Sequence, residues 1–171
     1  MIETPSPWVV RWGDYITRSP VLDVACGGGR HARFFAARGL RVVAADRDPR
    51  SIDGVEFVQA DLEKGAWPFG ERRFAAIVVT NYLHRPLFPL IETALDDGGA
   101  LIYETFMAGN ERYGRPSNPA FLLRPGELLQ AFANLQVVAF EQGVVERQQG
   151  SAVVQRLFAL RGQAEKVRIA A

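Results

Sequence analysis

The sequence has few of the residues that build disulfides, thiolate metal sites and lysine nucleophiles. Cys26 is the only cysteine, which excludes an internal disulfide and a cysteine-based metal cluster. Lys64 and Lys166 are the only lysines, and neither follows an apolar strand pattern, so a lysine nucleophile has few candidates. No cluster of carboxylates suggests a metal site, and we expect none.

No charge of one sign dominates, and no long hydrophobic run is present. The formal net charge is +1, which argues against extended nucleic-acid binding and against binding to an anionic membrane. No apolar stretch approaches the length of a membrane span, and no basic segment followed by an apolar run opens the chain. We therefore expect a cytoplasmic protein whose partner is a small-molecule substrate.

The hydrophobic pattern alternates between strands and helices, and 48% of the residues are hydrophobic, enough for a sizeable core. The predicted strands are Val21–Ala25, Arg41–Ala45, Val55–Gln59, Phe74–Thr80 and Ala100–Glu104, followed by Gln136–Phe140 and Ala152–Leu160 around a Gln- and Gly-rich turn. The predicted helices are His31–Arg38, Leu87–Leu95 and Pro125–Phe132. This order predicts one α/β domain over residues 1–171, with a Rossmann-like, mostly parallel sheet and helices on both faces. Only about nine residues join the second and third strands, so the helix there is short or missing.

Two further segments are candidates to cover a ligand. In residues 1–19, Trp8, Trp12 and Tyr15 recur at helical spacing, which fits either an N-terminal helical cap over the site or ordinary core packing. Residues 107–123 are rich in Gly, Asn, Pro and Arg and form either a lid loop or a disordered connection.

A glycine loop follows the first predicted strand. Gly27, Gly28 and Gly29 lie between this strand and a predicted helix, where a bare backbone can turn sharply and approach a ligand closely. The helix N-terminus behind the loop favours a negative group. The sequence therefore predicts a nucleoside-cofactor site here.

Acidic residues follow the next two strands. Asp46 follows Gly27 at close to the roughly 20-residue spacing expected for a carboxylate that binds ribose hydroxyls. It could also be a solvated loop acid. Asp61 follows the third strand, where it could accept a hydrogen bond from an adenine amino group or cap a turn.

Asp23 helps to choose between cofactors. Gly27-x-Gly29-x-x-Ala32 also satisfies the loose dinucleotide pattern, but Asp23 places a charge within an apolar strand, and a pyrophosphate would be repelled by it. An ammonium group, or loop N–H groups that need an acceptor, would be stabilised by the same carboxylate.

The ordered motifs resemble those of the class I S-adenosylmethionine-dependent methyltransferases. Residues 21–29, with an acid followed by glycines, are similar to the first motif of that family, and 74–81 and 95–101 are similar to its fourth-strand motif and the turn into its fifth strand. Ala25 stands where the family usually has its first glycine. Small bacterial members related to tellurite-resistance and quinone-pathway methyltransferases are the most similar, and the resemblance implies a seven-stranded sheet with an antiparallel last strand.

The resemblance implies S-adenosylmethionine as the cofactor and S-adenosylhomocysteine as its product. The cofactor-binding residues that it implies are Asp23, Ala25, Gly27, Gly29, Arg30, Asp46, Asp61, Leu62 and Asn81.

In-line methyl transfer needs an aligned acceptor and the exclusion of water, with a base only where the acceptor must lose a proton. His84 could be that base or a helix-start residue. Glu104 could be a base, a ligand for a substrate cation, or the partner of Arg115 or Arg124 in an ion pair. The candidate substrate residues are Tyr82, Arg85, Phe106, Tyr113 and Arg115.

Two other functions fit the same fold class. An NAD(P)-binding oxidoreductase domain would need a catalytic constellation, and no Tyr-x-x-x-Lys motif is present. A non-catalytic partner subunit would bind no nucleoside cofactor.

Overall fold

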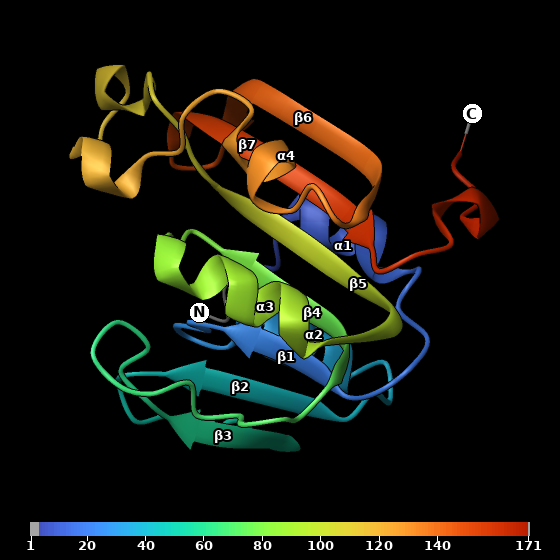
Figure 1. The fold of residues 1–171 in the computed structure, drawn as a ribbon. Coiled ribbons are helices and arrows are strands. Elements are labelled where there is room, and N and C mark those ends of the chain that lie inside the picture. The colour runs from blue at the N-terminus through green and yellow to red at the C-terminus, as the bar shows by residue number, and fades with distance from the viewer. Residues whose placement is uncertain (1–3, 171) are drawn as a thin grey trace.

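A seven-stranded sheet organises residues 4–170, the part of the chain that the computed structural model describes (Figure 1). The strand order is β3-β2-β1-β4-β5-β7-β6. Strands β1 to β5 and β6 run parallel, and β7 is antiparallel to both of its neighbours. The strands are β1 Val21–Val24, β2 Val42–Asp46, β3 Val55–Gln59, β4 Phe74–Thr80, β5 Leu95–Phe106, β6 Gln136–Arg147 and β7 Gly150–Leu160.

Short helices cover both faces of the sheet. Helices α1 and α2 lie on one face, and α3 and α4 lie on the other (Figure 1). The α-helices are α1 Pro7–Gly13, α2 Arg30–Ala36, α3 Phe88–Ala94 and α4 Glu127–Ala131, and the 3₁₀ turns are η1 Arg85–Leu87, η2 Asn110–Arg112, η3 Pro119–Phe121 and η4 Ala164–Lys166. None of the helices in residues 4–170 is both long and apolar enough to cross a bilayer.

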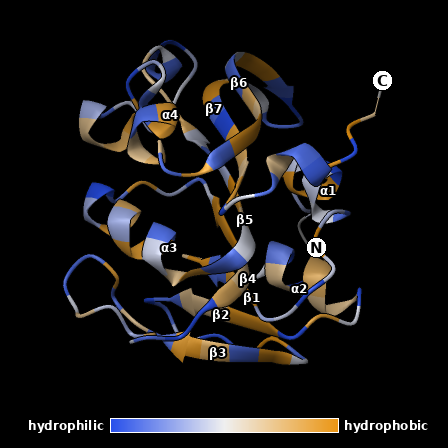
Figure 2. Ribbon diagram, turned by 45° about the vertical axis from the view of Figure 1, so that its right-hand side comes forward, coloured by the Kyte–Doolittle hydropathy of each residue, from blue (hydrophilic) through white to orange (hydrophobic). Residues whose placement is uncertain are grey.

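The core has two layers because alternate strand residues point to opposite faces. Ile77 and Leu101 pack with Phe132 on the α3 and α4 face. Val78 and Phe158 lie in the cluster on the α1 and α2 face. The central strands are therefore apolar on both sides, as their hydropathy colouring shows (Figure 2).

The chain order creates a switch point beside β1. Strand β1 pairs with β2 on one side and with β4 on the other, so the chain runs outward from β1 to β2 and β3 and then crosses back to β4. In open α/β sheets, a crevice for ligands forms at the carboxyl ends of the strands at such a point. The glycine loop after β1 lies there.

The sequence predicted the sheet and its first four strands correctly, and residues 47–54 between β2 and β3 contain no helix. The hairpin of the last two strands is present, but both strands were predicted too short. Strands β6 and β7 pair until Arg147 faces Gly150, so the turn contains only Gln148 and Gln149. The ladder continues because Val144 pairs with Val153, and Gly143 tolerates a φ of 147° within β6.

The aromatic residues of the expected cap pack in the core. Trp8 and Trp12 are both 2% exposed. The Trp12 ring stacks on Phe158 at 4.6 Å between centroids, and Nε1 of Trp8 donates to the Leu157 carbonyl at 3.3 Å. These contacts fix α1 on the sheet, and residues 1–3 of the expected cap lie outside the described residues.

Truncation of Ile77 should show how much this core contributes to the free energy of unfolding. Ile77 is fully buried in β4, so Ile77→Ala should lower the free energy of unfolding by about 3 kcal/mol through lost burial and a cavity. Urea denaturation would measure the loss. Val144→Ala, at a residue that is 53% exposed, is the control and should change stability by less than about 0.5 kcal/mol. Equal losses in the two variants would contradict this account of the core.

Candidate functional site

The loop after β1 turns through left-handed backbone conformations. Ala25 and Gly27 both have a φ of 53°, and Gly29 has a φ of 78°. The φ of Gly29 favours glycine, and a Cβ there would lie 2.4 Å from Cδ1 of Ile52, whose side chain would have to move. Gly27 and Gly28 face open space instead. Ala25 holds a conformation that favours glycine, and such strain concentrates at ligand-binding turns.

Asp46 fastens the loop from the end of β2. Its Oδ2 accepts a hydrogen bond from the Gly27 N–H at 2.8 Å, and its Oδ1 accepts one from the Asp48 N–H at 3.0 Å. Nε of Arg50 donates to the Gly27 carbonyl at 3.2 Å. The loop is therefore held at both its amide and its carbonyl.

Asp23 is a buried carboxyl beneath the same loop. Its Oδ2 accepts a hydrogen bond from the Ala32 N–H in the first turn of α2 at 3.0 Å, whereas its buried Oδ1 has no hydrogen-bond partner among residues 4–170. Burial raises the pKa of Asp23 to about 7, although the Ala32 N–H and the charge of Arg30 favour the ionised form. A buried oxygen without a donor is suited to a ligand that brings one.

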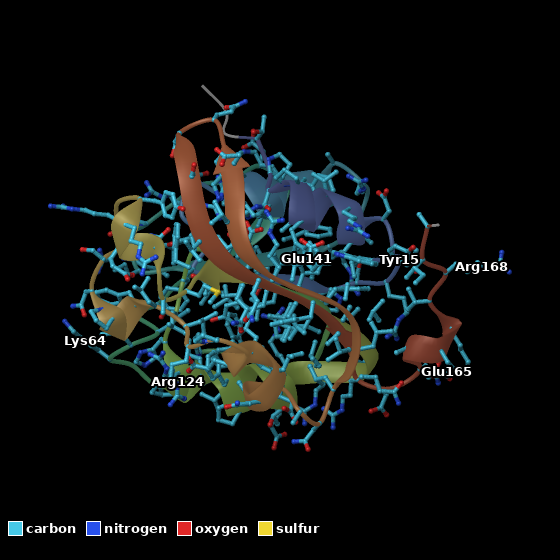
Figure 3. All side chains as sticks on the ribbon, turned by 90° about the horizontal axis from the view of Figure 1, so that it is seen from above. Tyr15, Lys64, Arg124, Glu141, Glu165 and Arg168 are labelled. Carbon is cyan, nitrogen blue, oxygen red and sulfur yellow. The ribbon has the colours of Figure 1, made fainter. Side chains whose placement is uncertain are left out.

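A cavity of about 540 Å³ opens beside the loop at the carboxyl ends of β1 to β4. It joins residues from four strand ends that are distant in sequence. Lys64 at its rim lies on the opposite side of the molecule from Tyr15 and Arg168 (Figure 3). The predicted residues that line it are Ala25, Gly27, Asp46, Asp61, Leu62, Asn81 and Tyr82.

Asn81 and Tyr82 form the wall of the cavity after β4. Asn81 has a φ of 53°, and its N–H donates to the Glu104 carbonyl at 2.9 Å. Burial, and then the negative charges of Glu63, Asp61 and Asp46, raise the pKa of Tyr82 above its usual range. Its phenol stays protonated at neutral pH and is a hydrogen-bond donor rather than a base.

Glu104 lies at the end of β5 and is 3% exposed. Its Oε2 accepts from Nε of Arg156 at 2.5 Å, and its Oε1 accepts from Oγ of Ser6 at 3.0 Å. Within residues 4–170, neither Arg115 nor Arg124 forms an ion pair with Glu104. The expected partners were therefore wrong, because the antiparallel pairing places Arg156 directly opposite Glu104.

His31 links α1 and α2 to this cluster. Its Nε2 accepts from the Ser6 N–H at 3.1 Å, and its Nδ1 lies 3.2 Å from Oγ1 of Thr80. Burial, followed by the charge of Arg30, lowers the pKa of His31 to about 3, so the ring is neutral. With Nε2 accepting, the proton of the ring is on Nδ1 and is donated to Thr80.

The other predicted site residues do not line the cavity. Arg85 forms two hydrogen bonds with Glu127, at 2.6 and 3.0 Å, and others with the carbonyls of Ala120 and Leu122, so it ties residues 107–123 to α4. Arg30 opens α2, and His84 precedes η1. Tyr113 and Arg115 are exposed, and Phe106 lies beneath the guanidinium of Arg147.

Sequence reasoning missed several residues around the site. Phe121 lines the cavity from the expected lid loop, together with Arg47, Arg50 and Lys64. The ring of His31 joins α1 and α2 to the sheet. The run of residues after Asp46 gave a weak signal for Arg47 and Arg50, whereas nothing in the sequence pointed to Arg147 or Arg156.

The comparisons with known proteins agree with this geometry. Residues 21–99 match a family model described as "Methyltransferase domain". None of the curated proteins matches the sequence.

Solved structures with the same fold include TehB from Haemophilus influenzae, at 17% identity and a TM-score of 0.76, with 90% of this chain aligned to 61% of that one. The present chain thus spans less than two thirds of TehB. A SAM-dependent methyltransferase from Methanosarcina mazei aligns at 14% identity and a TM-score of 0.70, covering 93% of this chain and 99% of that one.

A third structure with this fold contains ligands. The 1,6-didemethyltoxoflavin-N1-methyltransferase from Burkholderia thailandensis, with bound 1,6-didemethyltoxoflavin and S-adenosylhomocysteine, is 18% identical with a TM-score of 0.66. The alignment covers 91% of this chain and 76% of that one.

The buried carboxyl of Asp23 should make stability depend on pH. Its native pKa of about 7 is above the ordinary value of 3.8, so the folded protein binds the extra proton and loses stability as pH rises from about 4 to about 7. Asp23→Asn keeps an acceptor for Ala32 and removes the titration. Relative to wild type, this variant should gain about 4 kcal/mol across that range.

Chemical denaturation at a series of pH values would measure the difference. Asp53→Asn, at an exposed position outside the cavity, is the matched control for loss of one carboxylate. Parallel stability curves for wild type and Asp23→Asn would refute the raised pKa.

Proposed function

We propose that this chain, whose residues 21–99 carry a methyltransferase domain, transfers the methyl group of S-adenosylmethionine to a small-molecule acceptor. The observation that carries the proposal is the cavity at the switch point, where Asp46, Asp61 and Asn81 from three strand ends surround the turned glycine loop. The match to the family model, together with the S-adenosylhomocysteine-bound structures that share the fold, supports the cofactor.

The residues present fit such a cofactor. The carboxylate of Asp46 can accept from both ribose hydroxyls, and Asp61 can accept from the adenine amino group. Leu62 is buried beside Asp61 and offers an apolar contact. The unpartnered Oδ1 of Asp23, below the loop, suits a donor from the methionine end.

S-adenosylmethionine supplies a methyl group on a sulfonium, which is electrophilic without further activation. The protein then needs to orient the acceptor and exclude water. Asn81 and Tyr82 can orient polar groups at the cavity wall, and Phe121 of the 107–123 segment can cover the opening. We assign the lid role to this segment.

A base is needed only for an acceptor that loses a proton. The His84 ring has no hydrogen-bond partner within residues 4–170 and is available for that role, three residues past Asn81. Glu104 is buried in an ion pair with Arg156, which favours a positioning role over proton transfer.

The sheet also bears on the oxidoreductase alternative. Strand β7 lies between β5 and β6 and runs antiparallel to them, whereas the dinucleotide-binding order 3-2-1-4-5-6 has no such inserted strand. This topology favours methyl transfer.

Calorimetry with S-adenosylhomocysteine and with NAD tests the proposal. We expect saturable binding of S-adenosylhomocysteine and weaker binding of NAD. Asp46→Ala should weaken the binding of S-adenosylhomocysteine at least about tenfold, because it removes two charge-assisted hydrogen bonds and one fastening of the loop. Asp53→Ala, outside the cavity, should leave the affinity unchanged.

Tighter binding of NAD than of S-adenosylhomocysteine would favour the oxidoreductase. If Asp46→Ala binds both ligands as wild type does, Asp46 does not bind the ribose. Binding of S-adenosylhomocysteine with no methyl transfer from labelled cofactor to any component of a metabolite extract would favour a non-catalytic subunit.

A further inference from the structure

Arg147 lies at the tip of a hairpin that extends past the carboxyl end of β5. Phe106, the last residue of β5, pairs with Val154 of β7, but β6 and β7 continue to pair until Arg147 faces Gly150. The hairpin runs on well beyond Glu141 (Figure 3). Its tip therefore overhangs the edge of the sheet where the glycine loop and Asn81 also lie.

The guanidinium of Arg147 is incompletely paired. Its Nη2 lies 3.6 Å from Oε1 of Glu104, which is an ion pair but too long for a hydrogen bond. This nitrogen is buried and has no hydrogen-bond acceptor within residues 4–170. Glu104 does not accept from this nitrogen, and Ser6 and Arg156 donate to the two oxygens of that carboxylate. A buried donor without an acceptor destabilises the free protein, and an anion that supplies one is favoured.

The surroundings of Arg147 are rich in positive charge. Burial lowers the pKa of Arg147, and the charges of Arg156 and Arg30 lower it further, against the attraction of Glu104. The side chain of Arg147 is 27% exposed, so one side of it is accessible. Its Cζ also lies 5.1 Å from the centroid of the Phe106 ring, which fixes the plane beside a flat apolar surface.

A second donor lies on the other side of Glu104. Thr80 of β4 pairs with Glu104 in the sheet register. Because neutral His31 donates from Nδ1 to Oγ1 of Thr80, the hydroxyl proton of Thr80 is left for another acceptor, and none is present among residues 4–170. Arg147 and Thr80 thus each carry a donor without an acceptor, Arg147 in an ion pair with Glu104 and Thr80 on the strand paired with Glu104.

We propose that Arg147, with the hydroxyl of Thr80, binds a carboxylate of the methyl acceptor, so that the substrates are anionic small molecules. The planar guanidinium can donate two parallel hydrogen bonds to a carboxylate. The inference rests on the proposed function, because it assigns the acceptor to the edge of the sheet next to the cofactor cavity. Arg147 is a specificity-determining residue in this account.

Benzoate is a suitable probe, with benzamide as its neutral counterpart. Both would be titrated into full-length protein saturated with S-adenosylhomocysteine, while NMR follows the Nε–Hε signals of the arginines. We expect saturable shifts of the Arg147 signal with benzoate and at least tenfold weaker binding of benzamide. The absence of saturable binding of benzoate, or equal affinities for the two probes, would overturn the proposal.

Variants then locate the anion. Arg147→Met keeps the apolar stem and should weaken benzoate at least about tenfold, as loss of a hydrogen bond to a charged group predicts. Arg147→Lys should restore part of the affinity, and Thr80→Val should weaken benzoate by less than Arg147→Met. Arg73→Met removes an exposed arginine next to the start of β4, at the opposite edge, and should change nothing. Unchanged benzoate affinity in Arg147→Met would refute the assignment.

A further measurement distinguishes binding of the acceptor's carboxylate by Arg147 from binding of the cofactor's own carboxylate. Arg147→Met should bind S-adenosylhomocysteine and its decarboxylated analogue as wild type does. Weaker binding of S-adenosylhomocysteine alone would assign Arg147 to the cofactor and overturn the proposal. Thermal unfolding checks that Arg147→Met folds, which is expected because Glu104 keeps Arg156.

The two proposals fail in different ways. If S-adenosylhomocysteine does not bind to wild type, the proposed function fails, and the benzoate titration of the free protein still decides whether Arg147 holds a carboxylate. If S-adenosylhomocysteine binds and benzoate does not, only the anionic acceptor is refuted.

Discussion

The hydrogen bond from the Gly27 N–H to Asp46 is the contact on which the site depends. It joins the ends of β1 and β2 and holds a backbone turn that Ala25, Gly27 and Gly29 make in left-handed conformations. Beneath this loop, Asp23 accepts a hydrogen bond from the Ala32 N–H in the first turn of α2. Two carboxylates from adjacent strands therefore hold the loop open beside the cavity, and α2 starts where the loop ends.

A polar network on the other side of β1 fixes the remaining elements. Ser6 and His31 bring the starts of α1 and α2 to the ends of β4 and β5, where Thr80 and Glu104 lie. Each member is buried or half-buried, so removal of one leaves its partners unsatisfied. This network fixes the start of α1 against the ends of β4 and β5, next to the strand end that carries Asn81 of the cavity.

Sequence reasoning found what local patterns encode. The glycine loop and the acids after β2 and β3 follow from spacing along single connections, and the cavity contains most of the residues predicted for the cofactor. The hairpin was predicted too short because Gly143 resembled part of the turn, whereas only Gln148 and Gln149 form it. Arg147 and Arg156 were missed because their meeting with Glu104 depends on the register of β7 against β5, which no local pattern specifies.

The inserted antiparallel strand has an evolutionary consequence. Because β7 runs back through the sheet, its hairpin with β6 grows outward past the ladder without disturbing the strands that hold the loop. Insertions, deletions or exchanges at residues 144–151 would remodel the overhang while leaving Asp46 and Gly27 in place. The fold is thus a modular one, in which selectivity could diverge in one exchangeable arm of an otherwise constant scaffold.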